Sequence, residues 1–334
     1  MPLWLVLLLA YLFEFANGWT DAPNSIATVV STRVLRPVHA VVMASVLNLV
    51  GALAGTAVAK TIASGILDPE FVTLTTIGAA VLAATIWAMG AQYFGLPSSE
   101  SHALVAGLLG AGFAAGGLEA LEWSGTRKTL IGLITSPLGG FLMGLILMVL
   151  IYRIFSRVRR STVSRFFGKA QALSAAFMAF SHGTNDAQKT MGIITLAVLL
   201  NEAGPGGSVP ESFDIPLWVI LSAAFVIGVG TMVGGWRVIR TLGLRITKLE
   251  PVQGFAAETG AAAIITGAAQ LGIPVSTTHA IGSAIMGVGT TRRFSAVRWG
   301  VAGQVVSAWI LTWPSCMALG YALDKVLTVA FRAG

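Results

Sequence analysis

The chain has 334 residues, of which 55% are hydrophobic and only 10% are charged, and its mean hydropathy is +0.80. So few charged residues cannot cover a soluble globule of this size, and the composition therefore predicts an all-α polytopic membrane protein. The net charge of +7 comes from Lys and Arg placed between apolar segments, with no basic patch interleaved with aromatics, so nucleic acid is not an expected partner. The single cysteine, Cys316, excludes an intrachain disulfide and a CxxC metal site.

The apolar segments, taken in chain order, are long enough to cross a bilayer that needs about 20 helical residues. The first half contains segments at 3–34, 38–59, 71–94, 103–121 and 129–152, and the second half at 171–200, 216–236, 252–269, 280–289 and 296–323. The first segment of each half is interrupted by polar and helix-breaking residues, at 17–24 and at 181–189. We therefore expect one broken helix at the start of each half.

Two pairs of motifs recur in the same order in both halves. FANGWTDAPNS at 15–25 matches FSHGTNDAQKT at 180–190, and GLPSSESHALVAGLLG at 95–110 matches GIPVSTTHAIGSAIMG at 272–287. Matched motifs in matched order indicate an internal duplication. We expect repeats over 1–152 and 170–334, each with a broken helix, 3–34 or 171–200, and a re-entrant helical hairpin, 71–121 or 252–290.

The charges between segments predict an inverted topology. The loop at 153–169 holds six Lys or Arg and no acid, so the positive-inside rule makes it cytoplasmic. The linker at 201–216 has acids and no Lys or Arg, and is expected outside. Charges flanking the hairpins place their ends on opposite faces, so that the second repeat is upside down and both termini are external. Inverted repeats with broken helices are typical of secondary transporters, and we expect a multi-pass protein of the plasma membrane, specifically a prokaryotic inner membrane.

The broken helices and hairpin tips together predict an anion site. Interrupted helices survive in lipid only where they line a cavity or meet a ligand. Each half combines an aspartate on the broken helix, Asp21 or Asp186, with a hydroxyl-rich tip; the tip residues are Ser98, Ser99, Ser101, Ser276, Thr277 and Thr278. Hydroxyls and N–H groups at helix N-termini stabilise anions, which favours a tetrahedral oxyanion as substrate.

Several further side chains leave two interpretations open. Lys189 lies three residues after Asp186, so it either pairs with that aspartate or faces substrate oxygens. His102 and His279 either carry protons or pin the hairpins by hydrogen bonds, and Glu100 and Glu258 have either a coupling or a pairing role. The candidates for binding the coupling ion are Asp21, Asp186, Glu100, His102, His279 and Glu258.

The segments NGWTDAPNSIATVVSTRVLRP (17–37) and SHGTNDAQKTMGIITLA (181–197), with the two hairpin motifs, resemble the duplicated signatures of the inorganic phosphate transporter (PiT) family. The resemblance covers nearly the whole chain and implies an ion-coupled phosphate symporter that forms a homodimer. It implies that phosphate lies between the broken helices and the hairpin tips. The family pattern is close to G-x-N-D-x-x-N, and its Asp and Asn residues serve phosphate and, in sodium-coupled members, the cations.

This sequence departs from that pattern in both copies. The second copy keeps Asn185 and Asp186 but has Lys189 in place of the last Asn. The first keeps Asp21 and Asn24, and has a threonine in place of the first Asn. Because a fixed ammonium repels a nearby sodium ion, we favour proton coupling, with sodium coupling as the alternative. Sulfate is the alternative substrate. Fully ionised sulfate lacks the P–OH group of protonated phosphate, from which a carboxylate could accept a hydrogen bond.

Functions of other classes fit the sequence less well. A channel needs a continuous polar stripe or a charged ring. A membrane enzyme could pair His102 with Ser99 or His279 with Ser276, but such a pair occurring twice in opposite orientation suits a two-fold transport site better than a reaction centre. The sequence contains no Walker loop, Rossmann fingerprint or HExxH motif. We expect a transporter without enzymatic activity or cofactor, and no metal site is firmly predicted.

Overall fold

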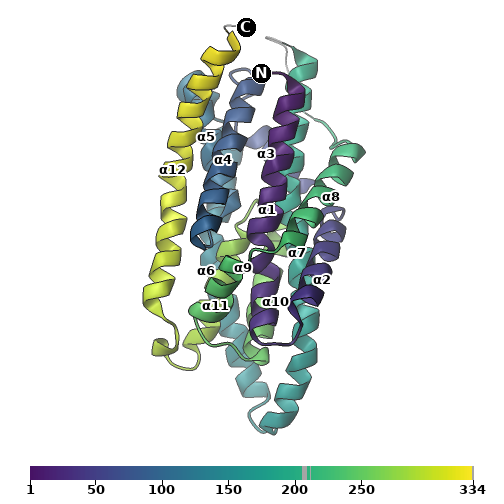
Figure 1. The fold of residues 1–334 in the computed structure, drawn as a ribbon, viewed down its shortest axis with the longest axis vertical. Helices are drawn as coiled ribbons and strands as arrows, with labels where there is room; N and C mark the ends of the chain where they lie inside the picture. The colour runs from purple at the N-terminus through teal and green to yellow at the C-terminus, as the bar shows by residue number, and fades with distance from the viewer. Residues whose placement is uncertain (205–208, 211, 333–334) are drawn as a thin grey trace.

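The structure is a computed structural model that describes residues 1–204, 209–210 and 212–332. Its helices are α1 (Leu3–Ser31), α2 (Pro37–Ala52), α3 (Ala57–Gly65), α4 (Leu74–Phe94), α5 (Glu100–Gly116), α6 (Trp123–Ile154), α7 (Arg160–Ala203), α8 (Leu217–Val233), α9 (Trp236–Arg240), α10 (Pro251–Gln270), α11 (Thr277–Thr290) and α12 (Trp299–Arg332). Short helical turns lie at Gly117–Ala120, Thr241–Arg245 and Phe294–Ala296. The predicted all-α class is confirmed (Figure 1).

The helices have the lengths and composition of membrane spans. Five described helices are long and apolar enough to cross a bilayer, and up to seven spans result if two bent pairs are each counted as one. The bent pairs are α2 with α3, at 68°, and α8 with the segment Trp236–Arg245, at 61°. Large apolar side chains are exposed along α6, α8 and α12, where they suit contact with lipid.

The helix breaks lie at positions other than those predicted. Both α1 and α7 continue as α-helices through 17–24 and 181–189, and α1 even contains Pro23. Their polar side chains are buried against the hairpins, so side-chain hydrogen bonds replace the expected opening of the backbone. The breaks instead separate α2 from α3 and α8 from α9, where Gly234 takes a left-handed φ of 67°.

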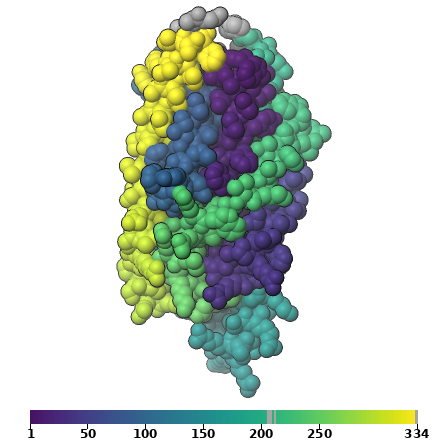
Figure 2. All heavy atoms as spheres, viewed as in Figure 1, coloured from purple at the N-terminus to yellow at the C-terminus, as the bar shows by residue number. Residues whose placement is uncertain are grey.

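The predicted loop at 153–169 is shorter in the structure. Residues 155–159 join α6 to α7, and residues 160–169 form the first turns of α7. Phe167 is buried there and packs edge-on against Phe155 and Phe255, which extends the helix beyond the apolar segment. The ends of α6 and α7 consequently project beyond the rest of the molecule (Figure 2). Part of the linker predicted at 201–216 lies outside the described residues.

The two hairpins have equivalent tips. Gly95 ends α4 and Gly272 follows α10, both with left-handed φ angles, 67° and 62°, and a proline two residues later precedes the next helix. Ser99 and Ser276 then cap α5 and α11 by accepting hydrogen bonds from His102 N and His279 N. Figure 1 shows α4 and α5 in the half of the molecule that holds both termini, and α10 and α11 in the other half. The tips therefore meet from opposite ends.

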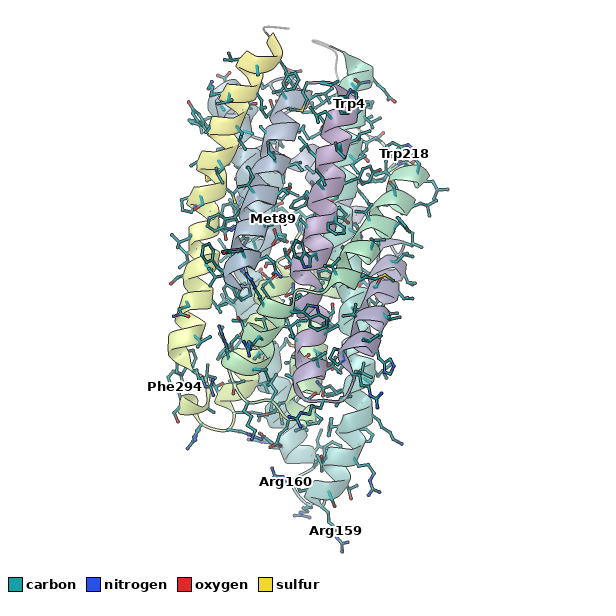
Figure 3. The ribbon with its side chains drawn as sticks, viewed as in Figure 1. Trp4, Met89, Arg159, Arg160, Trp218 and Phe294 are labelled. Atoms are coloured by element: carbon teal, nitrogen blue, oxygen red, sulfur yellow. The ribbon has the colours of Figure 1, made fainter. Side chains whose placement is uncertain are left out.

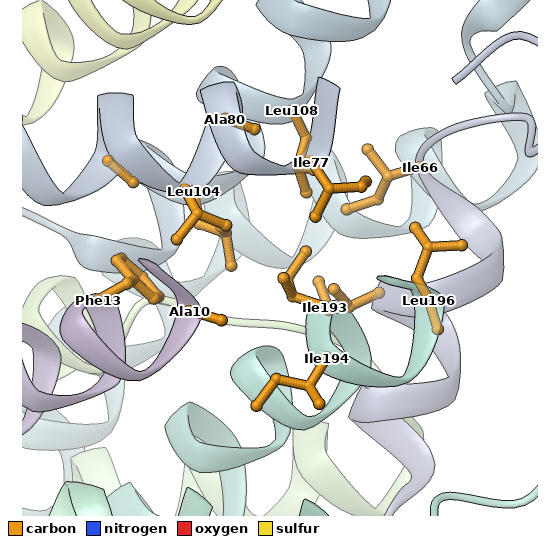
Figure 4. Close-up of a cluster of buried hydrophobic side chains, with 14 of the residues drawn as sticks. Ala10, Phe13, Ile66, Ile77, Ala80, Leu104, Leu108, Ile193, Ile194 and Leu196 are labelled. Carbon is orange, nitrogen blue, oxygen red and sulfur yellow. The ribbon is translucent and has the colours of Figure 1, made fainter. Parts of the chain in front are cut away.

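A polar layer separates two hydrophobic clusters. The first cluster contains Phe13 of α1 and Ile193 of α7, packed with Ile77 and Leu104 of α4 and α5 (Figure 4). The second contains Ile26 of α1 and residues of α7, α10 and α11. The polar stretches of α1 and α7 lie between these clusters, so the sequence motifs occupy the middle of the molecule.

The two ends of the molecule carry different kinds of residues. Arg159 and Arg160 lie at the end formed by α6 and α7, and Trp4 and Trp218 lie toward the end that holds the termini (Figure 3). Both termini lie at the same end (Figure 1). These positions agree with the predicted arrangement of termini opposite the basic segment.

Candidate functional site

The two hairpin tips touch within the polar layer. Ser101 at the start of α5 donates a hydrogen bond of 3.0 Å to the carbonyl of Val275, in the tip before α11. Asn185 of α7 is bonded to the same tip, since Val275 N lies 3.4 Å from its Oδ1. The tips of both repeats thus form one surface against α7.

Lys189 joins α7 to both tips. Its ammonium group is ion-paired with Asp186, lies 2.5 Å from Ser101 Oγ, and donates a 3.1 Å hydrogen bond to the Val275 carbonyl. Thr277 donates a 2.7 Å hydrogen bond to the other carboxylate oxygen of Asp186. The lysine is 1% exposed. The structure therefore contains the ion pair that the sequence allowed for Lys189, and this pair sits against both hairpins.

α1 binds the tip of the second hairpin through two polar residues. Thr278 Oγ1 donates to Asp21 Oδ1 at 3.2 Å, and Asn24 Nδ2 donates to Thr278 at 2.9 Å and to Thr277 at 3.2 Å. Asp21 and Asp186 thus contact neighbouring hydroxyls of one helix N-terminus. The two aspartates differ in that only Asp186 has a lysine.

His182 is a central residue that the sequence analysis missed. Its Nε2 lies 2.9 Å from Asp186 Oδ2 and 4.0 Å from Asp21 Oδ2, and its Nδ1 lies 3.0 Å from Asn48 Oδ1. Asn48 donates through Nδ2 to Thr231, whose hydroxyl donates to a carbonyl, so Oδ1 of Asn48 accepts from His182. Nδ1 therefore carries a hydrogen, and Nε2 faces the carboxyl group of Asp186.

The signal for His182 was present in the sequence. The histidine lies four residues before Asp186, which places the two side chains on the same face of a continuous helix. The expectation of a broken helix at 181–189 concealed this spacing.

Glu100 occupies the tip of the first hairpin. Its Oε1 accepts hydrogen bonds from Thr20 at 3.0 Å and from Ser98 at 3.4 Å, and its Oε2 is buried without a hydrogen-bond partner. The glutamate lies in the first turn of α5, where the helix dipole favours a negative charge. Thr20, the departure from the family pattern, thus serves as a donor to Glu100.

The two tip histidines pack together behind the polar surface. The rings of His102 and His279 have centroids 4.2 Å apart, and His279 stacks on Trp309 at 4.0 Å. His102 also lies 5.1 Å from Trp313. These contacts place both rings between the hairpins and α12, apart from the aspartates.

Glu258 is not brought together with the other candidates. Its carboxylate accepts hydrogen bonds from Thr28, from Gln171 at 3.1 Å, and from Ser174. Both oxygens are occupied by side chains of α1 and α7. Glu258 therefore connects α10 to these two helices within the second hydrophobic half.

One group among the described residues has the composition of a metal site. Asp21, His182 and Asp186 each offer a ligand atom, and these atoms lie within 4.8 Å of one another. The ammonium of Lys189 at Asp186 opposes a further cation there. We assign no metal to this group.

Comparison with known proteins identifies the family of this chain. The sequence profile described as the phosphate transporter family matches residues 17–320. The chain belongs to the phosphate transporter family. The match confirms the resemblance found in the paired motifs, and the protein is a transporter, not an enzyme.

Individual relatives of this phosphate transporter are similar over nearly their full length. A probable low-affinity inorganic phosphate transporter of Rhizobium meliloti (strain 1021) is 48% identical over 307 residues, covering 92% of this chain and 90% of the relative. One of Bacillus subtilis (strain 168) is 41% identical, covering 98% and 97%. Among solved structures, one titled "The sodium-dependent phosphate transporter" matches with a TM-score of 0.89 and 25% identity, over 98% of this chain and 99% of that one.

Proposed function

We propose that the protein imports inorganic phosphate by ion-coupled symport, with the proton as coupling ion. The phosphate would bind where the N-termini of α5 and α11 meet the polar faces of α1 and α7. Ser99, Ser101, Ser276 and Thr277 supply hydroxyls there, and helix N-termini favour anions. Lys189 supplies a positive charge in the same layer.

The balance of charge in this layer is the observation that carries the proposal. Its buried carboxyl groups are those of Glu14, Asp21, Glu100 and Asp186. Lys189 is ion-paired with one of them, Asp186, which leaves three carboxyls close to a site for an anion. Like charges without solvent between them repel strongly. Phosphate entry therefore has to be accompanied by cations that neutralise the remaining carboxyls.

Protons neutralise the carboxyls near Asp186, in the second repeat, more readily than sodium ions would. Lys189 already occupies the cation position beside Asp186, where the family pattern has an asparagine. Sodium remains the second candidate because a structure of high similarity is titled as sodium-dependent. In that case the ion would bind near Asp21 and Asn24, away from the lysine.

We extend the proposal to the architecture of transport. The repeats 1–152 and 170–334 would rock against each other, so that the hairpins open alternately to the two sides. The excess of arginine at the α6–α7 end favours a cytoplasmic position for that end and external termini, in a prokaryotic inner membrane. A homodimer follows from the family resemblance.

Uptake into proteoliposomes tests the coupling ion. With purified protein and labelled phosphate, an inward proton gradient in sodium-free buffer is expected to drive uptake, and an inward sodium gradient at equal pH is not. Uptake that requires sodium and ignores the proton gradient would contradict the proposal. Unlabelled sulfate should compete weakly, and competition equal to that of phosphate would make sulfate the substrate.

A further inference from the structure

Glu14 is a buried carboxyl that none of the phosphate-site contacts uses. It lies on α1, seven residues before Asp21 and thus on the same helical face, and its exposed fraction is 0%. Its Oε2 accepts a hydrogen bond from Thr190, the residue that follows Lys189 on α7. Glu14 is therefore linked to the helix that holds the ion pair, and it lies nearer than Asp21 to the N-terminal end of α1.

The surroundings of Glu14 favour a neutral carboxylic acid. Its Oε1 is buried without a hydrogen bond of normal geometry; its polar neighbour is Asn17, three residues along the helix, whose Oδ1 also has no partner. Among the described residues, no cationic side chain lies within ion-pair distance of Glu14. An added proton would supply the donor that these oxygens lack, since a protonated carboxyl donates one hydrogen bond.

The other carboxyls of the layer have stronger support for their negative charge. Asp186 has Lys189 and a threonine hydroxyl, and Asp21 has a threonine hydroxyl and faces His182. Glu100 has two hydroxyls, both at Oε1, and the N-terminus of α5; its Oε2, like Oε1 of Glu14, is buried without a partner. The ring of His182 is fixed between the carboxyl of Asp186 at Nε2 and the side chain of Asn48 at Nδ1.

The charged and titratable groups around Glu14 come from few elements. α8 contributes none and α4 only Tyr93. The buried groups from α1, α5 and α7 are Asp21, Glu100, His102, His182, Asp186 and Lys189, and α1 adds the half-buried Tyr11, whose hydroxyl is bonded to Ser222. Asp186 and Lys189, on the helix that holds Thr190, carry opposite charges and are paired with each other. Proton binding at Glu14 therefore changes the net charge of the layer by one unit.

We propose that Glu14 carries the coupled proton: it takes up a proton when the site faces outside and releases it when the site faces inside. This inference rests on the proposed proton coupling and names the residue responsible. When protonated, Glu14 removes one negative charge from the layer that phosphate enters. When deprotonated, it restores that charge, which favours departure of the anion. The proton is the only species exchanged at this residue, and no covalent bond to phosphate forms.

Glu14→Gln separates coupling from transport, because glutamine keeps the shape and the neutral charge but cannot exchange a proton. In proteoliposomes at equal pH on both sides, exchange of labelled for unlabelled phosphate should stay within about threefold of wild type. Lowering the external pH at a constant external concentration of H2PO4⁻ should raise the initial uptake rate of wild type several-fold. The same change should leave the rate of Glu14→Gln unaltered.

The control is a second buried glutamate. Glu258→Gln alters a carboxyl that is hydrogen-bonded on both oxygens and lies apart from the site. Its uptake should still respond to the external pH, and Glu14→Asp should recover part of the response. A further variant, Thr190→Val, removes a hydroxyl that stabilises the ionised form of Glu14. The proton is then held more tightly, and uptake should persist to higher external pH than in wild type.

The outcomes separate this inference from the proposed function. If wild type itself does not respond to the proton gradient, proton coupling is wrong and Glu14 carries no coupled proton. If wild type responds and Glu14→Gln responds equally, Glu14 is not the carrier and proton coupling stands. If correctly folded Glu14→Gln loses exchange as well, Glu14 belongs to phosphate binding, and the inference is also overturned.

Discussion

Lys189 makes the two halves of the site unequal. Asp21 and Asp186 occupy equivalent places in the repeated motifs and both contact the start of α11. Only Asp186 has an ammonium beside it, and that ammonium also reaches the tip of the first hairpin. A buried charge that loses its partner costs about 3–5 kcal/mol, so this pair has to be maintained through the transport cycle.

Replacing either aspartate should stop transport. Asp21→Asn removes the acceptor of the Thr278 hydroxyl and the charge facing His182, and Asp186→Asn removes the partner of Lys189. We expect uptake of labelled phosphate to fall at least about a hundredfold in each, with expression and membrane insertion retained. Near-normal uptake in either variant would remove that aspartate from the site.

Lys189→Asn restores the residue that the family pattern has at this position. Asparagine supplies a carbonyl oxygen where the ammonium excluded other cations, and oxygen ligands suit sodium. We expect uptake by this variant to become sensitive to external sodium, measured as the initial rate with sodium against choline. Lys189→Arg keeps the positive charge, so its uptake should stay insensitive to sodium. A sodium response in both variants would show that the ammonium group is not what excludes sodium.

Single residues also mark what the sequence could and could not predict. Three of the predicted tip hydroxyls, those of Ser101, Thr277 and Thr278, bridge a hairpin tip to the other tip or to α7 and α1, because matched motifs in a duplicated chain identify equivalent places. Glu14 and Thr190 were missed, since their contact depends on which helices pack together, and His182 was missed because the expected helix break concealed its spacing from Asp186. Glu258 was grouped with the coupling residues because depth in the membrane was all that the sequence gave for it.

At the scale of elements, the repeated glycines of the motifs serve helix packing. A Cβ on Gly18 of α1 would lie 2.5 Å from the carbonyl oxygen of Ile227 on α8, and a Cβ on Gly183 of α7 would lie 2.1 Å from that of Asn48 on α2. The equivalent glycines thus let α1 and α7 approach equivalent helices of the opposite repeat. Small residues at such crossings are typical of membrane helix pairs.

Gly183→Ala should therefore disturb the site indirectly, through the packing of α7 against α2. The added methyl group pushes α2 away and displaces Asn48, which positions His182. We expect a loss of stability of about 1–3 kcal/mol and reduced uptake, measured by thermal unfolding in detergent and by transport. Gly168→Ala in the same helix is the control, because nothing lies within 4 Å of its added Cβ. Equal effects of the two substitutions would contradict the packing role.

Helix continuity explains why the predicted breaks were misplaced. Polar and breaker residues within apolar sequence suggested open backbone at 17–24 and 181–189, yet α1 and α7 keep their helical hydrogen bonds there. Burial of polar side chains against the hairpin tips gives them partners without opening the helix. The bends of α2–α3 and α8–α9 occur in sequence with few polar residues, and glycines alone mark them: Gly55 at the first bend, Gly234 and Gly235 at the second.

At the scale of the whole molecule, the charge distribution predicts one orientation. Ser161 is the neighbour of Arg160, which lies at the end opposite the termini (Figure 3), and Ser124 lies in the first turn of α6, whose other end joins α7 there. Both are exposed, and the native Cys316 is buried. In intact cells, a membrane-impermeant maleimide should label Ser124→Cys and leave Ser161→Cys unlabelled until the membrane is opened. The reverse pattern would invert the proposed topology.

We expect phosphate to bind between the two hairpin tips, against α1 and α7. The most direct measurement is a structure of the protein in lipid nanodiscs with bound phosphate, compared with one prepared without phosphate. We expect phosphate density at the N-termini of α5 and α11, within hydrogen-bond distance of Ser101 or Thr277 and next to Lys189. Phosphate density elsewhere, with the Lys189–Asp186 pair and both tips unchanged, would contradict it.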